Sequence, residues 1–459
     1  SELMRLDLVS FAADGAILPR ETGVSDRPMK GSTPFVSPES LRITLNLPHR
    51  GPLTGLAIRR GITLIVGGGY HGKSTLLKAL ESGVYNHIAG DGREYVITDA
   101  TAVKLRAEDG RSVNCVDISL FIRDLPNKKD TASFSTADAS GSTSQAAAVV
   151  ESIEAGARAF LIDEDTSATN FMLRDDLMQR IVSRDKEPIT PFLERARDLY
   201  EQAGISTVLV AGSSGAYFFI ADTVIQMDSY RPFDITEAVR AACQAEKSRP
   251  QITAPGFRLP ASGRKMSSAG TGRAVGVLAL TSGEETDSDA DGEGNAAAQG
   301  GAPARTLAET AGRGRYERAG GRGRGGRNGN GESDSRHGGR DGRGADSRTG
   351  RPAQSGRGDR IKVRVQGRYA FQVAKEPVDL RFVEQLADSE QTAALAQMIR
   401  LCLEKNLLDR MSVCEIVDFL EAQYAQKGLG AFSDSSYCAM GLALPRRQEI
   451  FACLNRFRG

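Results

Sequence analysis

The sequence has no tryptophan, only four histidines and no uninterrupted apolar run long enough to cross a bilayer as a helix. We therefore expect no membrane-spanning segment. Its six cysteines are scattered without a Cys-x-x-Cys pair, and no cysteine–histidine cluster has the spacing of a zinc site. Free thiols in a reducing, intracellular compartment are the expectation. The chain begins Ser-Glu-Leu-Met and shows no signal or transit pattern there.

Large apolar residues are scarce in one interior stretch of this 459-residue chain. Residues 284–293 are acidic, and residues 312–360 carry repeated Gly-Arg pairs. Such a segment cannot bury enough apolar surface to offset the entropy of ordering it, so disorder is predicted. The net charge of +1 averages these opposite blocks and indicates no partner by itself. We predict a core at 1–255, an insert at 256–360 and a C-terminal domain at 361–459.

Short apolar runs alternate with helical patterns in the first part of the chain. Ile62–Val66, Ala159–Ile162 and Ser206–Val210 have the length and composition of buried strands. Strands that alternate with helices predict an α/β core with a largely parallel sheet. After the insert, two short alternating strands within 361–373 and helical spacing beyond Leu386 predict a small, mostly helical α+β domain.

A glycine-rich loop stands between the first of these strands and a helical pattern. It fits the phosphate-loop motif G-x-x-x-x-G-K-[ST], and its context disfavours the alternative of an ordinary glycine-rich turn. Glycines let backbone N–H groups surround an anion, and the N-terminus of the helix adds positive potential. The lysine would reach the β- and γ-phosphates, and the serine would ligate Mg²⁺. The predicted ATP-contacting residues are Gly67, Gly68, Gly69, Tyr70, His71, Gly72, Lys73, Ser74 and Thr75.

Two carboxylates, Asp163 and Glu164, come directly after the apolar run that starts at Ala159. A strand that ends in this way would place Asp163 beside the phosphate loop, where it could hold the Mg²⁺ shell together with Ser74. Glu164 would then polarise the attacking water as general base, with Lys73 as the second catalytic group. The alternative is a strand with ordinary polar caps, which the neighbouring phosphate loop disfavours.

The segment Ser-Gly-Ser-Thr-Ser-Gln that starts at Ser140 resembles a variant of the ABC signature, and it begins 23 residues before Asp163. Asp165 and the five residues after it resemble the D-loop of the same class. The strings GGGYHGKSTLL, FSTADASGSTSQAA and LIDEDTSATNFM resemble the family called predicted ATPases of the ABC class. Within this family the chain is similar to ATPases of kinetoplastid mitochondrial RNA-binding complexes, which are linked to RNA editing. The resemblance covers roughly residues 1–240 and resumes at about 361.

This resemblance implies a head-to-tail homodimer with ATP held between two protomers. Ser140, Gly141 and Ser142 of one copy would contact the γ-phosphate bound to the other, because a helix N-terminus favours anions. Without the family, the same residues could be a flexible polar loop with a helix cap. The resemblance also implies a mitochondrial location, with the cytoplasm as the alternative, and membership of a larger RNA-processing complex.

Two residues usual in ABC ATPases are missing. No glutamine lies between Ser74 and Ser144, and no histidine lies between His87 and His337. The Q-loop glutamine and the switch histidine are therefore absent, and Gly-Ser-Ser-Gly from Gly212 stands in place of the latter. Asp117 is the candidate to take over part of the Q-loop role. We expect ATP to bind and to be hydrolysed slowly.

The Gly-Arg repeats indicate an RNA contact, single-stranded by preference. Arginine stacks on bases and forms forked hydrogen bonds to phosphates, and glycine lets it adapt. The alternative is a solvated linker whose arginines are neutralised by the acidic block at 284–293. Arg59 and Arg60 could add to a basic face near the nucleotide or along a dimer channel, but ordinary surface charge is the favoured explanation for them.

These observations predict an RNA-associated ABC-class ATPase whose ATP-driven closure changes its grip on RNA. One alternative is an RNA-binding scaffold in which ATP is a structural clamp with negligible turnover, as the missing glutamine and histidine favour. A transporter subunit is disfavoured by the lack of an apolar span. A DNA-repair or condensation ATPase is disfavoured because long coiled-coil heptads are absent.

Overall fold

The computed structural model describes residues 2–23, 25–175, 178, 181–182, 186–246, 254–261, 263–266, 361–433 and 441–458. Most of the predicted insert at 256–360, and the disorder predicted for it, therefore lies outside the described residues. Within the described ranges, no helix combines the length and the apolarity that a membrane crossing requires.

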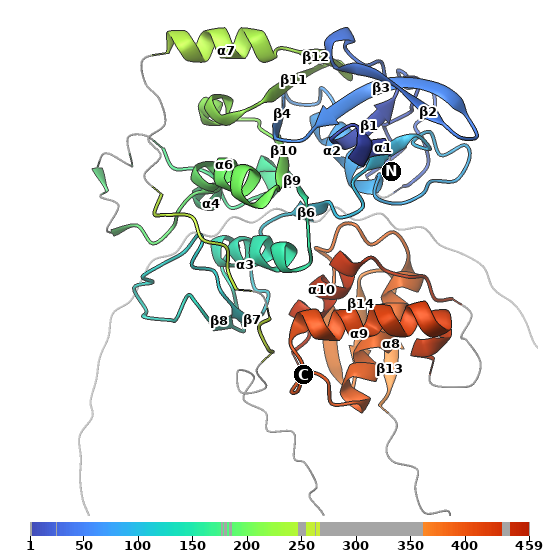
Figure 1. Cartoon of the computed structure of the whole chain (residues 1–459), viewed down its shortest axis with the longest axis vertical. Helices are drawn as coiled ribbons and strands as arrows, with labels where there is room; N and C mark the ends of the chain where they lie inside the picture. Colours follow the sequence, from blue (N-terminus) through green and yellow to red (C-terminus); the bar gives the residue numbers. More distant parts are fainter. Residues whose placement is uncertain are drawn as a thin grey trace, which may run out of the picture. The chain divides into compact units, whose positions relative to one another are not determined.

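A six-stranded sheet with the order β12-β11-β4-β10-β9-β6 forms the centre of the first part of the chain (Figure 1). Every neighbouring pair is parallel except β11 and β12. The predicted α/β core with a largely parallel sheet is confirmed. Its strands are β4 (Ile62–Val66), β6 (Val103–Leu105), β9 (Ala159–Asp163), β10 (Ser206–Val210), β11 (Thr223–Asp228) and β12 (Arg231–Asp234).

Strand β10 lies between β4 and β9, and its register fixes where their ends fall. Val210 pairs with Ile65 of β4 on one side and with Asp163 of β9 on the other. The carboxyl ends of β4 and β9 are therefore level. As a result, the loop after Val66 and the carboxylates at the end of β9 come to the same edge of the sheet.

Both faces of this sheet are buried, because alternate strand residues join different apolar clusters. Phe160 and Ile162 pack in one cluster with the helices α3 and α6, while Leu161 and Val208 pack in the other with α2. The helices of the core are α1 (Glu2–Arg5), α2 (Lys73–Ser82), α3 (Gly141–Glu154), α4 (Thr169–Met172), α6 (Phe192–Ala203) and α7 (Thr236–Ala245).

An antiparallel sheet with the order β2-β3-β1-β5 extends the α2 side of the core (Figure 1). Its strands are β1 (Leu8–Ala13), β2 (Arg42–Leu47), β3 (Gly51–Arg59) and β5 (Val96–Thr98). A second pair, β7 (Val113–Val116) and β8 (Phe134–Thr136), lies beside α3.

The C-terminal region is the small α+β unit that the sequence predicts. Its three antiparallel strands are β13 (Val363–Val365), β14 (Ala370–Val373) and β15 (Glu376–Asp379), and its helices are α8 (Ser389–Glu404), α9 (Val413–Lys427) and α10 (Arg447–Arg456). The helices and strands share one buried cluster that includes Phe371, Leu395, Ile416 and Phe451.

Buried charges join this region to the core. The Arg456 guanidinium pairs with the Glu108 carboxylate, and each side chain is less than a tenth exposed. Arg111 next to it pairs with Glu151 of α3 at 2.8 Å. The charge of Arg456, and behind it that of Arg111, offsets the cost of burying Glu108 and holds the pKa of its carboxyl below the ordinary value.

Candidate nucleotide-binding site

The phosphate loop lies between β4 and α2, and two of its glycines are required by their surroundings. Gly67 has φ of 135°, and a Cβ there would lie 2.3 Å from the Met227 carbonyl oxygen. Gly72 has φ of 96°, and a Cβ there would lie 2.7 Å from the Tyr230 ring. Residues with side chains rarely adopt either conformation, so the backbone path of this loop depends on glycine.

The Lys73 ammonium group folds back over its own loop. Its Nζ donates to the carbonyl oxygens of Gly67 and Gly68, at 2.8 Å each. Lys73 is also the first residue of α2, so the charge and the free N–H groups of the helix lie at one place. This arrangement suits a polyanion such as a nucleotide phosphate chain.

The turn between β11 and β12 braces the other side of the loop. Tyr230 N donates to the His71 carbonyl oxygen at 3.1 Å, and His71 Nδ1 lies 2.8 Å from Asp228 Oδ1. Tyr70, by contrast, is wholly exposed and has φ of 64°. Sequence reasoning did not find this bracing turn, because its contacts join segments far apart in the chain.

Ser74 and Asp163 meet directly. The Ser74 hydroxyl donates to Asp163 Oδ2 at 3.1 Å, and Asp163 Oδ1 accepts from Asp165 N at 3.2 Å. Asp163 is buried at the end of β9. A hydroxyl and a carboxylate are the hard oxygen donors that Mg²⁺ accepts alongside water and phosphate oxygens, so the pair fits that ion.

Glu164 is held by the segment that follows β10. Its Oε2 accepts from Gly212 N at 2.6 Å and from Ser213 N at 3.1 Å, and Ser213 Oγ donates to Oε1. Gly212 and Ser213 occupy the place where the sequence lacks a switch histidine. Behind Glu164, burial and the charge of that carboxylate raise the pKa of Tyr217, whose hydroxyl donates to the Met172 carbonyl oxygen.

The signature segment caps α3 and contacts the D-loop of the same chain. Ser140 is the N-cap residue, and its Oγ accepts from Thr143 N at 3.4 Å. Ser142 Oγ donates to Asn170 Oδ1 at 2.6 Å. The Gln145 amide is fully buried, donates to Ser167 Oγ at 3.0 Å and accepts from Ala168 N at 2.8 Å.

The predicted site residues therefore fall into two groups. The phosphate loop, Ser74, Asp163 and Glu164 come together at the carboxyl edge of the sheet. Among the described residues, no hydrogen bond joins Ser140, Gly141 or Ser142 to the phosphate loop of the same chain. The Asp117 carboxylate accepts a local hydrogen bond from Ser119 N at 3.0 Å.

Comparison with known families places the chain. The model of the P-loop domain of the ABC_ATPase family matches residues 1–257, more than half of the sequence. The chain belongs to this family of ABC-class ATPases. A second family model, the MRB1590 C-terminal domain, matches residues 362–459.

Individual proteins match the chain over part of its length. An uncharacterized protein, MJ1628 of Methanocaldococcus jannaschii, is 33% identical over 190 residues. That match covers 41% of each chain, so the chain spans about two fifths of this curated relative. The cbiO1 subunit of the Clostridium perfringens ABC transporter complex cbiONQ aligns with 52% of this chain and 93% of its own, at 12% identity and a TM-score of 0.31. MJ1267, an ATP-binding cassette of an ABC transporter, aligns with 45% and 93% at 11% identity and a TM-score of 0.28.

Proposed function

We propose that this ABC-class ATPase binds Mg-ATP between two copies of itself, hydrolyses it slowly and uses the resulting closure to change its grip on RNA. The observation that carries the proposal is the meeting of Lys73, Ser74 and Asp163 at one edge of the sheet. Those groups supply an ammonium ion, a hydroxyl and a carboxylate around a loop of backbone N–H donors.

ATP binding rests on the phosphate loop. The amides from Gly67 to Gly72 and the N-terminus of α2 would surround the phosphates, with Lys73 on the β- and γ-phosphates and Thr75 beside them. Ser74 and Asp163 would hold Mg²⁺. The ion would draw negative charge from the β- and γ-phosphate oxygens when bound.

Hydrolysis rests on Glu164. Its carboxylate would accept a proton from the attacking water. Its three hydrogen bonds from Gly212 and Ser213 fix its position but occupy the oxygens that a water would approach. With no switch histidine and no Q-loop glutamine, we propose slow turnover. A turnover rate typical of a transporter ATPase in the purified protein would contradict this.

The partner protomer is proposed to complete the site. The signature residues Ser140, Gly141 and Ser142 open the 14-residue helix α3, whose first N–H groups favour an anion. Ser142 hydrogen-bonds Asn170 in the D-loop of its own chain. The phosphate loop of that chain would then be covered by the signature residues of another copy. ABC ATPase domains typically dimerise, in keeping with this arrangement.

RNA is proposed as the cargo on two grounds. The Gly-Arg repeats at 312–360 offer guanidinium groups to phosphates and bases. The C-terminal match and the resemblance to ATPases of mitochondrial RNA-binding complexes point the same way. A mitochondrial location and membership of an RNA-processing complex belong to this proposal. The alternative is an RNA-binding scaffold in which ATP is a structural clamp with negligible turnover. The hydrogen bonds that Gly212 and Ser213 donate to Glu164 favour this alternative, because they occupy its carboxylate.

The test compares ATP binding, turnover and dimer mass in parallel variants. Lys73→Ala should abolish ATP binding, because it removes the ammonium group of the phosphate loop. Glu164→Gln should keep ATP and accumulate a closed dimer, because it removes the base and leaves the phosphate contacts. Lys78→Ala, an exposed lysine on the same helix, is the matched control and should behave as wild type.

Each variant separates one part of the proposal. If Glu164→Gln hydrolyses ATP at the wild-type rate, Glu164 is not the base. If wild type binds ATP and RNA but shows no turnover, the clamp alternative holds. Normal ATP binding by Lys73→Ala would overturn the assignment of the phosphate loop itself.

A further inference from the structure

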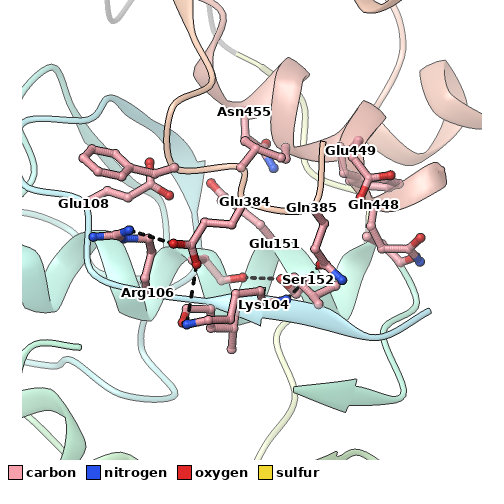
Figure 2. Close-up of a pocket in the computed structure, with 18 of the residues that line it drawn as sticks. Lys104, Arg106, Glu108, Glu151, Ser152, Glu384, Gln385, Gln448, Glu449 and Asn455 are labelled. Atoms are coloured by element: carbon pink, nitrogen blue, oxygen red, sulfur yellow. Dashed lines mark hydrogen bonds and ion pairs between the residues drawn. The ribbon is translucent and has the colours of Figure 1, made fainter. Parts of the chain in front are cut away.

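A short segment of the C-terminal region, between β15 and α8, contacts the core through Glu384 and Gln385 (Figure 2). Glu384 lies between two cations of the core. Its Oε1 is 2.9 Å from Arg106 Nη1, and its Oε2 is 3.5 Å from Lys104 Nζ. The Lys104 side chain is only 5% exposed, so this pair lies in a poorly solvated place.

Lys104 continues the contact to the D-loop. Its Nζ donates to Thr166 Oγ1 at 3.3 Å, and Thr166 Oγ1 donates to the Asp163 carbonyl oxygen at 3.2 Å. Ala107 N also donates to the Thr166 carbonyl oxygen at 3.0 Å. A continuous chain of polar contacts therefore runs from Glu384 through Lys104 and Thr166 to the backbone of Asp163.

Gln385, the next residue, reaches the other half of the candidate site. Its Oε1 accepts from Lys104 N at 2.9 Å, and its Nε2 lies 3.2 Å from the Glu81 carbonyl oxygen. Glu81 belongs to α2, the helix that begins at the phosphate loop. Two successive residues of the C-terminal region thus contact both halves of the candidate site. Glu384 reaches the D-loop through Lys104, and Gln385 contacts the end of α2.

Charge and burial make this contact sensitive to its members. Glu384 Oε2 is buried and has no hydrogen bond among the described residues, so Lys104 is the cation that faces this oxygen, while Arg106 pairs with Oε1. Glu81 Oε2 is likewise buried without a hydrogen bond among the described residues. Removing Lys104 would leave Glu384 Oε2 buried without its ion-pair partner, and breaking a buried ion pair is costly.

We propose that Lys104 and Glu384 are positioning residues, through which the C-terminal region sets the place of the D-loop and hence of the ATP site at the dimer interface. The inference rests on the proposed function, since the D-loop would lie where the two protomers meet. A shift of the C-terminal region, for example on contact with a partner, would then reach the site through Lys104.

The test measures hydrogen–deuterium exchange in the nucleotide-free full chain and ATPase kinetics of the same proteins. Lys104→Met should speed exchange of the amides at 164–168, which include the first part of the D-loop, about tenfold, the effect of losing one charge-assisted hydrogen bond. Exchange at residues 67–75 should stay unchanged. Glu384→Gln should act in the same direction, and Lys104→Arg should restore protection. In the ATPase assay, Lys104→Met should lower kcat about tenfold and leave KM for ATP the same.

Arg264→Gln is the matched control. Arg264 pairs with Glu154 at 2.8 Å in a site of similar burial that also tethers the C-terminal region, but it does not touch the D-loop. The proposal is overturned if Arg264→Gln loosens residues 164–168 as much as Lys104→Met does, or if Glu384→Gln leaves them unchanged. Failure of wild type to bind ATP would defeat the proposed function instead, while the exchange data would still decide the positioning.

Discussion

Lys73 braces its own loop and, in the proposed site, would also bind the phosphates. Its ammonium group donates to the carbonyl oxygens of Gly67 and Gly68. Phosphate binding would exchange those partners, because the same three N–H bonds must serve the β- and γ-phosphates. The shape of the loop therefore has to be fixed by its backbone, and the glycines with positive φ carry that task.

Gly72→Ala should reduce ATP affinity by at least about tenfold, the result of losing roughly 1–2 kcal/mol to backbone strain and to contact with the Tyr230 ring. Isothermal titration with a non-hydrolysable ATP analogue measures the change. Gly90→Ala is the control, because Gly90 also has a positive φ, no atom lies within 4 Å of its added Cβ, and it lies outside the phosphate loop. Equal losses in the two variants would show that the effect does not arise from the phosphate loop.

At the scale of elements, some parts of the molecule follow from the sequence and others do not. Strands β4, β9 and β10 were predictable because each is an apolar run buried on both faces. The phosphate loop was predictable because its function depends on consecutive residues. The partners of Glu164 were not, because Gly212 and Ser213 lie 48 and 49 residues further along the chain. No local pattern marks a contact of that kind.

The end of helix α2 provides a test of electrostatics. Burial raises the pKa of Glu81 from an ordinary value of 4.5 to about 7, and the negative charge of Glu384 is the second cause. Between these two pH values the folded chain holds a proton that the unfolded chain releases. The free energy of unfolding therefore falls as pH rises through this interval, and the loss is complete above about pH 7.

Glu81→Gln should thus stabilise the protein at pH 8, by on the order of 2–3 kcal/mol, and make no difference below about pH 4.5. Urea unfolding followed by circular dichroism across this range measures the gain. Glu237 is an exposed glutamate on α7, and Glu237→Gln is the control. Its effect on the free energy of unfolding should not change with pH. A gain for Glu81→Gln that does not vary with pH would refute the explanation by a raised pKa.

At the scale of the whole molecule, Met266 and Ile361 are the described residues on either side of residues 267–360. Both pack against the apolar cluster of the C-terminal region. Two residues before Met266, the Arg264 carbonyl oxygen accepts a hydrogen bond from Val413 N at 3.0 Å. The insert can therefore be shortened without separating the C-terminal region from the core, which makes its contribution to RNA binding measurable by itself.

Deletion of residues 284–360 should lower affinity for single-stranded RNA and flatten its salt dependence, because about 0.7 counterions per lost phosphate contact are no longer released. ATP binding should be unchanged, since the site residues all lie before residue 257. Deleting only the acidic block at 284–293 should raise RNA affinity if that block neutralises the arginines in cis. Fluorescence anisotropy at several salt concentrations measures both effects. Unchanged affinity and slope after the long deletion would make the segment a linker, and RNA would then have to contact the core or the C-terminal region.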